Sequence, residues 1–461
     1  MAKYDFIILG AGPGGYVAAL RAALLKAKVA LIEKESLGGV CMNWGCIPTK
    51  ALYRCAKLYQ EMEQAQSFGL ECSGLKADLA AMSARKDKIV LVLTTALAKL
   101  LAQRKVDVFN GFGYLLDPNR VQVIGPGLKE VLEARFIILA TGTECSPHPV
   151  VEVDNKQVHD VKSILQLTEV PKHLFVIGGG VSGCEFAQVF SALGSKITMT
   201  KRSKAPIKEL DADIEKTLVR TFKKRKYRML FGDSVNQAQV TAGGLKAVLG
   251  SGQEVEADLG LVTVGHRPLT YEIGLEEAGL ELDRAGHVKV DDRARTNIEH
   301  IYAIGDVTGQ HLLAHFASHM GLTAVHHALG DKEARVNPEA VPKAVFTDPE
   351  LAWVGLTEAQ AKDRFGQVKC GQFLIRTLGR STADGHLDGL VKVVAQGDKD
   401  IVVGVHILGP DASSLIAEGT LAVNKGLTLK DLAQTIHAHP TYPEALHEAV
   451  ETALGLPIHN L

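Results

Sequence analysis

The chain has 461 residues, 46% of them hydrophobic and 22% charged, with a formal net charge of −1. This composition is typical of a folded protein of about three domains and excludes a disordered or fibrous chain. Because 51 basic residues balance 52 acidic ones, we expect no nucleic-acid partner. The most apolar window, 89–98, is shorter than the roughly 18 residues of a spanning helix. With no apolar signal core at the N-terminus, we expect no membrane contact and a cytoplasmic location.

The N-terminal segment contains the first of two similar patterns. A β-branched strand, 6–9, leads into a glycine cluster, a helical stretch at 16–25 and a second strand at 29–32. The glycines of the cluster are Gly10, Gly12 and Gly15. In such a unit the first glycine makes a tight turn, the second admits a pyrophosphate and the third lets helix and strand pack closely. The pattern predicts a dinucleotide site, with a ligand-free tight turn as the alternative.

The same pattern follows the strand predicted at 174–177, with a helix at 184–193 and a strand at 197–199. Its glycines are Gly178, Gly180 and Gly183. One G-x-G-x-x-G motif is weak evidence, whereas two copies, each between a strand and a helix, are strong evidence for two dinucleotide-binding domains. Buried-type strands ending in glycine turns, at 136–142 and 259–265, are expected to close these domains.

The C-terminal part follows a different pattern. Before it, the basic stretch 216–228 is predicted to be a solvated helix face. From residue 341 onward, strands such as 391–394 and 401–405 precede a helix at 413–424. No glycine fingerprint occurs there. We therefore predict an α/β protein with two Rossmann-like dinucleotide-binding domains and a C-terminal α+β domain.

Two cysteines five residues apart, Cys41 and Cys46, follow the first unit. They can bridge if the chain folds back at Gly45, and Pro48 suits a first helical turn, which would put Cys46 where the helix dipole stabilises a thiolate. Seven cysteines in so long a chain do not make a secreted disulfide scaffold. Because no second cysteine pair completes a tetrahedral site, we expect no metal. Two buried thiols without chemistry are the alternative.

Near the C-terminus, the motif His437-Ala-His439-Pro-Thr precedes Glu444. Dithiol exchange needs a base for the thiol proton, and a carboxylate against an imidazole raises its basicity and fixes its tautomer. His439 and Glu444 are five residues apart across a proline turn, which is compatible with such a contact. A purely structural histidine is the alternative.

Together these motifs resemble the flavin-dependent pyridine nucleotide–disulfide oxidoreductases over essentially the whole chain, and among them the dihydrolipoamide dehydrogenase branch. The resemblance rests on the two fingerprints, the segment Gly-Gly-x-Cys-x₄-Cys-Ile-Pro-Thr-Lys, the segment 301–307 and the double-histidine motif 437–441. It implies that Cys46 is the flavin-proximal thiol and that Cys41 attacks the substrate. It also implies that His439 and Glu444 act as a pair supplied by the other subunit, and therefore an obligate homodimer.

The resemblance further implies FAD and NAD(P) as cofactors. Glu33 would accept the adenosine ribose hydroxyls of FAD, and Asp306 would bind its ribityl chain. Lys50 would lie near the reactive flavin nitrogen, paired with Glu185. Two residues at a strand end, Thr141 and Gly142, are also predicted to bind cofactor. The expected domains are 1–145 (FAD-binding, with the disulfide), 146–267 (NAD(P)-binding), 268–338 (central part of the FAD domain) and 339–461 (dimerisation).

One position departs from the lipoamide enzymes. Glu33 lies 18 residues after Gly15, and Lys201 lies 18 residues after Gly183, so a lysine occupies the position of the ribose-binding acid. An acid there selects NAD, whereas Lys201 and Arg202 can accommodate a 2′-phosphate. We therefore expect a preference for NADP(H), with an ordinary solvated turn as the alternative.

The predicted activity is electron transfer between a dithiol or disulfide, most closely a protein-bound lipoamide, and NAD(P), through FAD and the Cys41–Cys46 pair. A lipoyl-bearing carrier protein is then the expected partner. One alternative is an NADPH-dependent reductase of another disulfide, similar to glutathione reductases. The other is a non-catalytic flavin-binding redox sensor.

Overall fold

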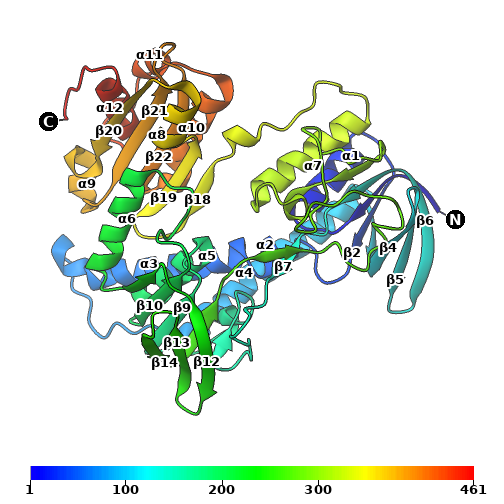
Figure 1. The fold of residues 1–461 in the computed structure, drawn as a ribbon, viewed down its shortest axis with the longest axis horizontal. Coiled ribbons are helices and arrows are strands. Elements are labelled where there is room, and N and C mark those ends of the chain that lie inside the picture. The colour runs from blue at the N-terminus through cyan, green and yellow to red at the C-terminus, as the bar shows by residue number, and fades with distance from the viewer. Residues whose placement is uncertain (1, 461) are drawn as a thin grey trace. The chain divides into compact units, whose positions relative to one another are not determined.

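The computed structural model describes residues 2–460 and contains two compact units. The first unit comprises Met1–Ala51, Ala80–Ser146 and Gly265–Val336, and the second comprises Leu52–Leu79, Pro147–Val264 and Asn337–Leu461. Each unit is built from segments that are far apart in the chain, because a later strand completes a sheet begun by earlier ones (Figure 1).

The first unit contains a sheet of order β3-β2-β1-β6-β5-β4, in which β17 also pairs with β6. Strands β1, β2, β3, β6 and β17 form its parallel part. Helices α1 and α7 pack against each other, and Ile7 and Leu9 of β1 lie in one core cluster with Val121 and Val123 of β5. The strands are β1 (Ala2–Leu9), β2 (Val29–Glu33), β3 (Asp107–Asn110), β4 (Phe112–Asp117), β5 (Arg120–Gly125), β6 (Leu128–Leu139), β7 (Thr143–Cys145), β16 (His266–Pro268) and β17 (Ile301–Ala303). The helices are α1 (Pro13–Leu24), α2 (Gly39–Asn43), α3 (Cys46–Glu63, which continues into the second unit), α4 (Leu79–Gln103) and α7 (Ala314–Ala328).

The second unit contains a parallel sheet of order β11-β10-β9-β15-β8. The small antiparallel sheet β12-β13-β14 packs on it, with Leu245 and Val255 in the same cluster as Phe175 and Val262. The elements are β8 (Val158–His159), β9 (His173–Ile177), α5 (Val181–Ala192), β10 (Lys196–Lys201), α6 (Ala212–Lys224), β11 (Arg228–Phe231), β12 (Val235–Thr241), β13 (Gly244–Leu249), β14 (Glu254–Ala257) and β15 (Leu259–Val262).

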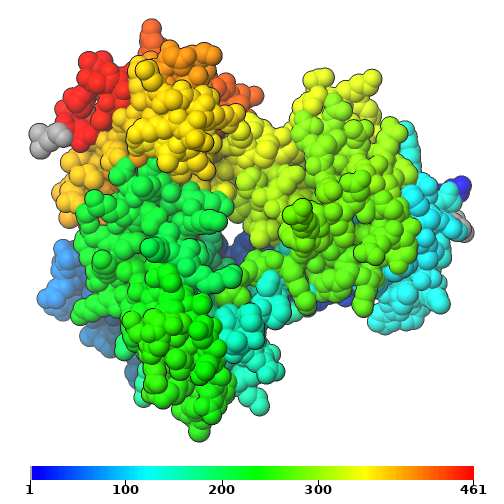
Figure 2. All heavy atoms as spheres, in the orientation of Figure 1, coloured from blue at the N-terminus to red at the C-terminus, as the bar shows by residue number. Residues whose placement is uncertain are grey.

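The C-terminal part of this unit, yellow to red in Figure 2, is an antiparallel sheet of order β18-β19-β22-β21-β20. Val391 and Val393 of β21 pack into a core shared with α10, α11 and α12, whereas Lys392 faces the opposite side, toward α6 and α8. The elements are β18 (Lys343–Val345), β19 (Glu350–Gly355), α8 (Glu358–Phe365), β20 (Val368–Leu374), α9 (Gly379–Asp384), β21 (Leu390–Gln396), β22 (Val402–Gly409), α10 (Ala412–Lys425), α11 (Leu429–Ala433) and α12 (Glu444–Ala453).

The predicted fold class is confirmed: each glycine fingerprint joins a parallel strand to a helix, and the C-terminal part is α+β. The predicted helix face at 216–228 is only partly correct, because α6 ends at Lys224. Lys226 has a positive φ of 61°, and Tyr227 is buried with its hydroxyl donating to the carbonyl of Ala187. Burial of this aromatic side chain turns the basic stretch away from a helical path. Within residues 2–460, no helix combines the length and the apolarity that crossing a membrane requires.

Candidate active site

The first fingerprint joins β1 to α1, and each of its glycines has a different environment. Gly10 has a φ of +102°, and a Cβ there would lie 2.3 Å from the carbonyl oxygen of Ala140. A Cβ on Gly15 would lie 1.8 Å from the carbonyl oxygen of Gly10, whereas one on Gly12 would meet open space. The turn thus combines a tight bend, close helix–strand packing and an open approach for a diphosphate.

Polar side chains next to this turn fit a flavin dinucleotide. The carboxylate of Glu33, at the end of β2, accepts hydrogen bonds from the backbone of Ala11 (2.7 Å) and Glu35 (2.8 Å). Burial raises the pKa of Asp306 to about 6, and the hydroxyl of Thr143 donates to it at 3.3 Å. The hydroxyl of Thr141 is buried without a hydrogen-bond partner in the described chain. Buried polar oxygens of this kind are suited to the hydroxyl groups of a ligand.

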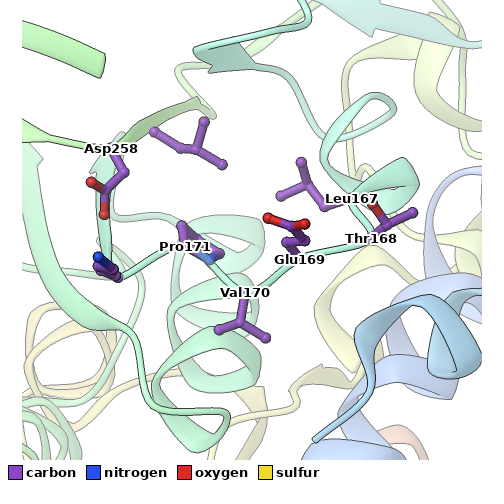
Figure 3. A pocket seen from close by; sticks show the side chains of 8 residues that line it. Leu167, Thr168, Glu169, Val170, Pro171 and Asp258 are labelled. Carbon is purple, nitrogen blue, oxygen red and sulfur yellow. The ribbon is translucent and has the colours of Figure 1, made fainter. Parts of the chain in front are cut away.

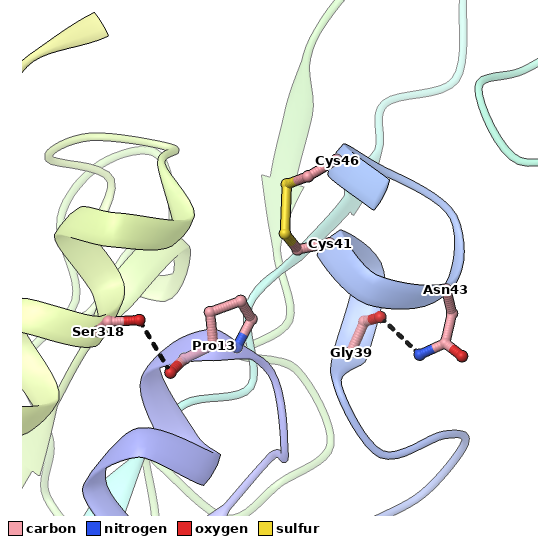
Figure 4. Close-up of a disulfide and its surroundings, with 6 residues drawn as sticks. All are labelled: Pro13, Gly39, Cys41, Asn43, Cys46 and Ser318. Carbon is pink, nitrogen blue, oxygen red and sulfur yellow. Dashed lines mark hydrogen bonds between the residues drawn. A yellow bond between two sulfur atoms is a disulfide. The ribbon is translucent and has the colours of Figure 1, made fainter. Parts of the chain in front are cut away.

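The cysteine pair forms the predicted bridge (Figure 4). Cys41 lies on α2 and Cys46 is the first residue of α3; a disulfide joins them, with their Cα atoms 4.6 Å apart. The side-chain amide of Asn43 donates to the carbonyls of Leu37 (3.0 Å) and Gly39 (2.9 Å) and so closes the α2 turn. Because Cys46 begins an 18-residue helix, the helix dipole favours the thiolate of Cys46 over that of Cys41.

The second fingerprint, between β9 and α5, repeats this geometry. Gly178 has a φ of +108°, and a Cβ there would lie 2.4 Å from the carbonyl oxygen of Thr263. A Cβ on Gly183 would lie 2.1 Å from the carbonyl oxygen of Gly178, and one on Gly180 would meet open space. This turn is equally suited to a dinucleotide diphosphate.

The two basic residues beyond this fingerprint differ in their surroundings. Lys201, the last residue of β10, donates from Nζ to the carbonyl of Pro206 at 2.5 Å, and burial lowers its pKa. Arg202 is exposed, and its charge adds to burial in lowering the pKa of His148. Arg202 is therefore the more accessible of the two cations.

Lys50 and Glu185, the predicted partners near the flavin, belong to different elements. Lys50 is half-buried on the first turns of α3. Glu185, on α5, is buried, and its carboxylate accepts a hydrogen bond from the backbone of Phe346 at 3.1 Å. Their pairing stays a prediction.

The predicted histidine–glutamate pair is in contact. Nδ1 of His439 lies 2.7 Å from Oε1 of Glu444, the first residue of α12, and the backbone N–H of Thr441 donates to Oε2 at 2.7 Å. Burial alone would raise the pKa of Glu444, but the Thr441 and His439 contacts lower it below its ordinary value. The side chain of His439 is 78% exposed, so a base oriented by a carboxylate lies at the surface of this unit.

A family model described as pyridine nucleotide-disulphide oxidoreductase matches residues 4–329, and the dimerisation domain of the same family matches residues 341–450. The chain belongs to this family. It is therefore a flavin- and pyridine nucleotide-dependent oxidoreductase, and its dimerisation domain supports a homodimer.

Several relatives match this family member over nearly its whole length. The dihydrolipoyl dehydrogenase of Chlamydia muridarum is 38% identical over 99% of this chain and 98% of its own length, and that of Geobacillus stearothermophilus is 37% identical over 99% and 97%. Among solved structures, LpdA from Mycobacterium tuberculosis is similar with a TM-score of 0.92 and 29% identity, covering 98% and 99% of the two chains. A Cu(II) complex of the HOCl-induced flavoprotein disulfide reductase RclA from Escherichia coli has a TM-score of 0.88 and 26% identity, covering 98% and 100%.

Sequence reasoning missed three polar contacts of the site. Asn43 closes the disulfide turn, Thr143 donates to Asp306, and His437 pairs with Glu418. Asn43 lies inside the cysteine motif and Thr143 directly follows the predicted Thr141–Gly142 pair, so proximity to a motif was the available signal for both. Nothing in the local sequence indicates Glu418, which lies 19 residues before His437.

A groove of about 450 Å³ lies beside β9 of the second unit (Figure 3). It is lined by Leu167, Thr168, Glu169, Val170, Pro171, Lys172, Asp258 and Leu259. None of the predicted site residues is among them. In the chain between residues 2 and 460, no three His, Cys, Asp or Glu side chains cluster closely enough to hold a metal ion.

Proposed function

We propose that the protein is a dihydrolipoyl dehydrogenase, which oxidises a carrier-bound dihydrolipoyl group and reduces a nicotinamide dinucleotide. The observation that carries this proposal is the combination, in one chain, of the Cys41–Cys46 disulfide with the His439–Glu444 pair. The full-length similarity to dihydrolipoyl dehydrogenases supports the lipoyl group as substrate. A lipoyl-bearing carrier and a cytoplasmic location belong to the same proposal.

The dithiol reaction follows from the chemistry of these four residues. His439 takes the proton of one substrate thiol, and the resulting thiolate attacks Sγ of Cys41. The Cys41–Cys46 bond breaks, and its electron pair stays on Cys46, whose thiolate the dipole of α3 stabilises. The second substrate thiol, losing its proton to solvent, then displaces Cys41, which takes the proton held by His439. The products are the substrate disulfide, the Cys41 thiol and the Cys46 thiolate.

The residues around the first fingerprint would hold FAD. Glu33 would bind the adenosine ribose, Asp306 and Thr141 the flavin side chain hydroxyls, and the open face at Gly12 the diphosphate. When bound, FAD supplies two-electron transfer between the reduced cysteine pair and the nicotinamide. Lys50 with Glu185 is proposed as the charged pair near the flavin nitrogen.

The dithiol site is proposed to need two subunits. His439 and Glu444 belong to the part of the chain that matches the dimerisation domain, which ends at residue 450. In the proposed arrangement, this pair serves the disulfide of the partner subunit, so that each homodimer has two composite sites. The domain boundaries at 145, 267 and 338 are part of the same proposal.

We also propose a preference for NADP(H), carried chiefly by Arg202. The guanidinium is exposed, whereas Lys201 is bound to Pro206. A charge-assisted bond to a 2′-phosphate contributes about 1.5–3 kcal/mol, or roughly 10- to 100-fold in affinity. Lys201→Glu with Arg202→Ala should therefore shift kcat/KM toward NAD(H) and leave the flavin content unchanged. The preference would be contradicted if the unmodified protein discriminated against NADP(H) as strongly as a relative with an acid at this position.

One experiment tests the activity. The purified holoenzyme is assayed with dihydrolipoamide, and in the reverse direction with lipoamide and glutathione disulfide, using each nicotinamide in turn. We expect turnover of the lipoyl pair and little reduction of glutathione disulfide. Preferential reduction of glutathione disulfide would support the alternative reductase, and failure of every dithiol to reduce the flavin would support a redox sensor.

A further inference from the structure

The loop that carries the proposed base enters the hydrophobic core at Tyr442. Residues 438–440 of this loop are exposed, and the side chain of His439 is 78% exposed. Three positions further along the chain, Tyr442 is only 8% exposed and belongs to the core cluster that β21 and α12 share. Tyr442 thus lies between His439 and Glu444 in the sequence, and its ring fixes the end of an otherwise exposed turn.

The hydroxyl of Tyr442 has an ionised partner on a neighbouring helix. It donates to Oδ2 of Asp384, the last residue of α9, at 2.9 Å, and Nε of Arg380 donates to the same oxygen at 2.7 Å. Burial and the bond to Asp384 raise the pKa of Tyr442, so its hydroxyl stays protonated near neutral pH. Burial would raise the pKa of Asp384, but the hydrogen bonds from Tyr442 and Arg380 hold it below its usual range. The contact therefore joins a permanent donor to an ionised acceptor, which makes it a strong hydrogen bond.

Backbone hydrogen bonds connect this anchor to the His439–Glu444 pair. The N–H of Thr441 donates to Oε2 of Glu444 at 2.7 Å. The carbonyl of Tyr442 accepts a hydrogen bond at 3.0 Å from the N–H of Ala445, in the first turn of α12. A shift of Tyr442 would therefore move both the loop that carries His439 and the start of the helix that carries Glu444.

We propose that Tyr442, held by Asp384 on α9, is a positioning residue that fixes His439 and Glu444 relative to each other for proton transfer from the substrate dithiol. This inference deepens the proposed function and rests on it. A general base must lie within hydrogen-bond reach of the proton that it takes, and a displacement of about 1 Å can cost on the order of 100-fold in rate. A phenylalanine would keep the ring in the core, so the proposed role depends on the hydroxyl of Tyr442.

The test is the variant Tyr442→Phe, which keeps the buried ring and removes the bond to Asp384. We expect reduction of the disulfide by dihydrolipoamide to slow by roughly 5- to 20-fold, through kcat with an unchanged KM, because the base is displaced. Reduction of the flavin by NAD(P)H should keep its wild-type rate, since that step does not use His439. The matched control is Tyr227→Phe, which removes another buried tyrosine hydroxyl, a donor to the carbonyl of Ala187 at 3.2 Å. This control should keep the wild-type dithiol rate.

The variant Asp384→Ala tests the same contact from the acceptor side. It should slow the dithiol step as Tyr442→Phe does, and the double variant should be no slower than either single variant, because all three lack the same bond. Asp384 also pairs with Arg380, whose side chain is 48% exposed. Arg380→Ala removes only that pair and should change the rate little.

A spectroscopic measurement separates positioning from a general loss of structure. Because Nδ1 of His439 lies 2.7 Å from Glu444, the proton of the neutral ring sits on Nδ1, and Nε2 is left to accept a proton. In ¹⁵N-histidine-labelled holoenzyme, with the His439 signals assigned by their loss in His439→Ala, this tautomer should dominate in wild type and in Tyr227→Phe. In Tyr442→Phe it should be mixed with the other tautomer.

Three results would overturn the positioning role: an unchanged dithiol rate in Tyr442→Phe, an unchanged tautomer of His439 in that variant, or additive losses in the double variant. An equal loss of dithiol rate in Tyr227→Phe would overturn it too, since any missing buried hydroxyl would then suffice. If dihydrolipoamide does not reduce the wild-type enzyme, the proposed function fails, and the tautomer of His439 still decides the role of Tyr442.

Discussion

Two cysteines joined in one disulfide acquire different chemistry from their backbone positions. Cys46 begins the 18-residue helix α3, whereas Cys41 lies inside the five-residue helix α2. Only Cys46 therefore has the N-terminus of a long helix to stabilise its thiolate. The family resemblance implies that Cys46 lies on the flavin side and Cys41 on the substrate side, and this asymmetry is compatible with those roles.

The first prediction tests this assignment with single serine substitutions. After two-electron reduction, the holoenzyme should show a long-wavelength thiolate-to-flavin absorption band that Cys46→Ser abolishes. Cys41→Ser should retain or strengthen the band, because it leaves an unpaired thiolate at Cys46. Absorption spectra of both variants with equal flavin content provide the measurement, and the opposite pattern would reverse the two roles.

The second prediction concerns Asp306, whose pKa burial raises from 3.8 to about 6. Between these values the folded protein binds more protons than the unfolded chain, so the stability of flavin-free protein falls as pH rises through this window. At pH values above this window, the charge on Asp306 lowers the free energy of unfolding by roughly 3 kcal/mol. Asp306→Asn should therefore stabilise flavin-free protein near neutral pH, and the gain should vanish at about pH 4.

Thermal unfolding of flavin-free protein across pH measures this difference. The control is Asp283→Asn in the same unit, where hydrogen bonds from His287 and Ala285 hold the pKa of the carboxyl below its usual range. The control should lose stability at neutral pH rather than gain it. If Asp306→Asn is no more stable than wild type near neutral pH, burial of Asp306 does not penalise its charge.

Lys201 shows where residue-level prediction from sequence ends. The strand predicted at 197–199 is present but longer, and Lys201, 18 residues after Gly183, is the last residue of β10. The direction of its side chain depends on the carbonyl of Pro206, and neither propensity nor spacing encodes that contact. Arg202, the next residue, is exposed, so it is a better candidate than Lys201 for binding a phosphate.

At the scale of helices and strands, the glycine turns were predictable and the buried ion contacts were not. Gly10 and Gly178 need positive φ, and Gly15 and Gly183 face a carbonyl oxygen, so their requirements lie within one strand–turn–helix segment. Lys392 instead contacts residues 34 to 181 positions away along the chain. Its place between Val391 and Val393 in β21 gives no indication of which acids surround it.

The third prediction concerns this buried lysine, which is 1% exposed on β21, between β22 and β20. Its Nζ lies 2.8 Å from Asp211, 2.6 Å from Asp213 and 2.7 Å from Glu358, so it neutralises the acids that join α6 and α8 to the sheet. Burial opposes the charge of Lys392, but its hydrogen bonds to these three carboxylates raise its pKa above the usual range. Lys392→Ala would leave the buried carboxylate of Asp211 uncompensated, at a cost of about 3–5 kcal/mol.

Urea unfolding of the holoenzyme, monitored by near-ultraviolet circular dichroism, measures this loss. Lys362→Ala is the matched control, because Lys362 binds the same Glu358 at 2.5 Å but its side chain is 56% exposed. Exposed pairs contribute at most about 1 kcal/mol, so the control should change stability little. Equal losses of stability in the two variants would show that Lys392 does not compensate the buried charge of Asp211.

At the scale of the whole molecule, the groups of the proposed dithiol reaction are divided between the two units of the chain. The Cys41–Cys46 disulfide belongs to the first unit, and the His439–Glu444 pair belongs to the second. The second unit also contains the segment that matches the family's dimerisation domain. The proposed composite site of two subunits would explain why Glu444 orients His439 within one chain while the histidine ring stays exposed.

The last prediction tests this arrangement by mixing two inactive chains, Cys41→Ser and His439→Ala, in one co-expressed dimer. If the histidine serves the partner's disulfide, a hybrid dimer has one site with both wild-type groups and one site with both defects. Half of randomly assembled dimers are hybrids, so the mixture should recover about a quarter of wild-type dithiol activity. Hybrids isolated through two different affinity tags should recover about half. If the pair instead serves its own chain, no site in any dimer is complete, and mixing should restore nothing.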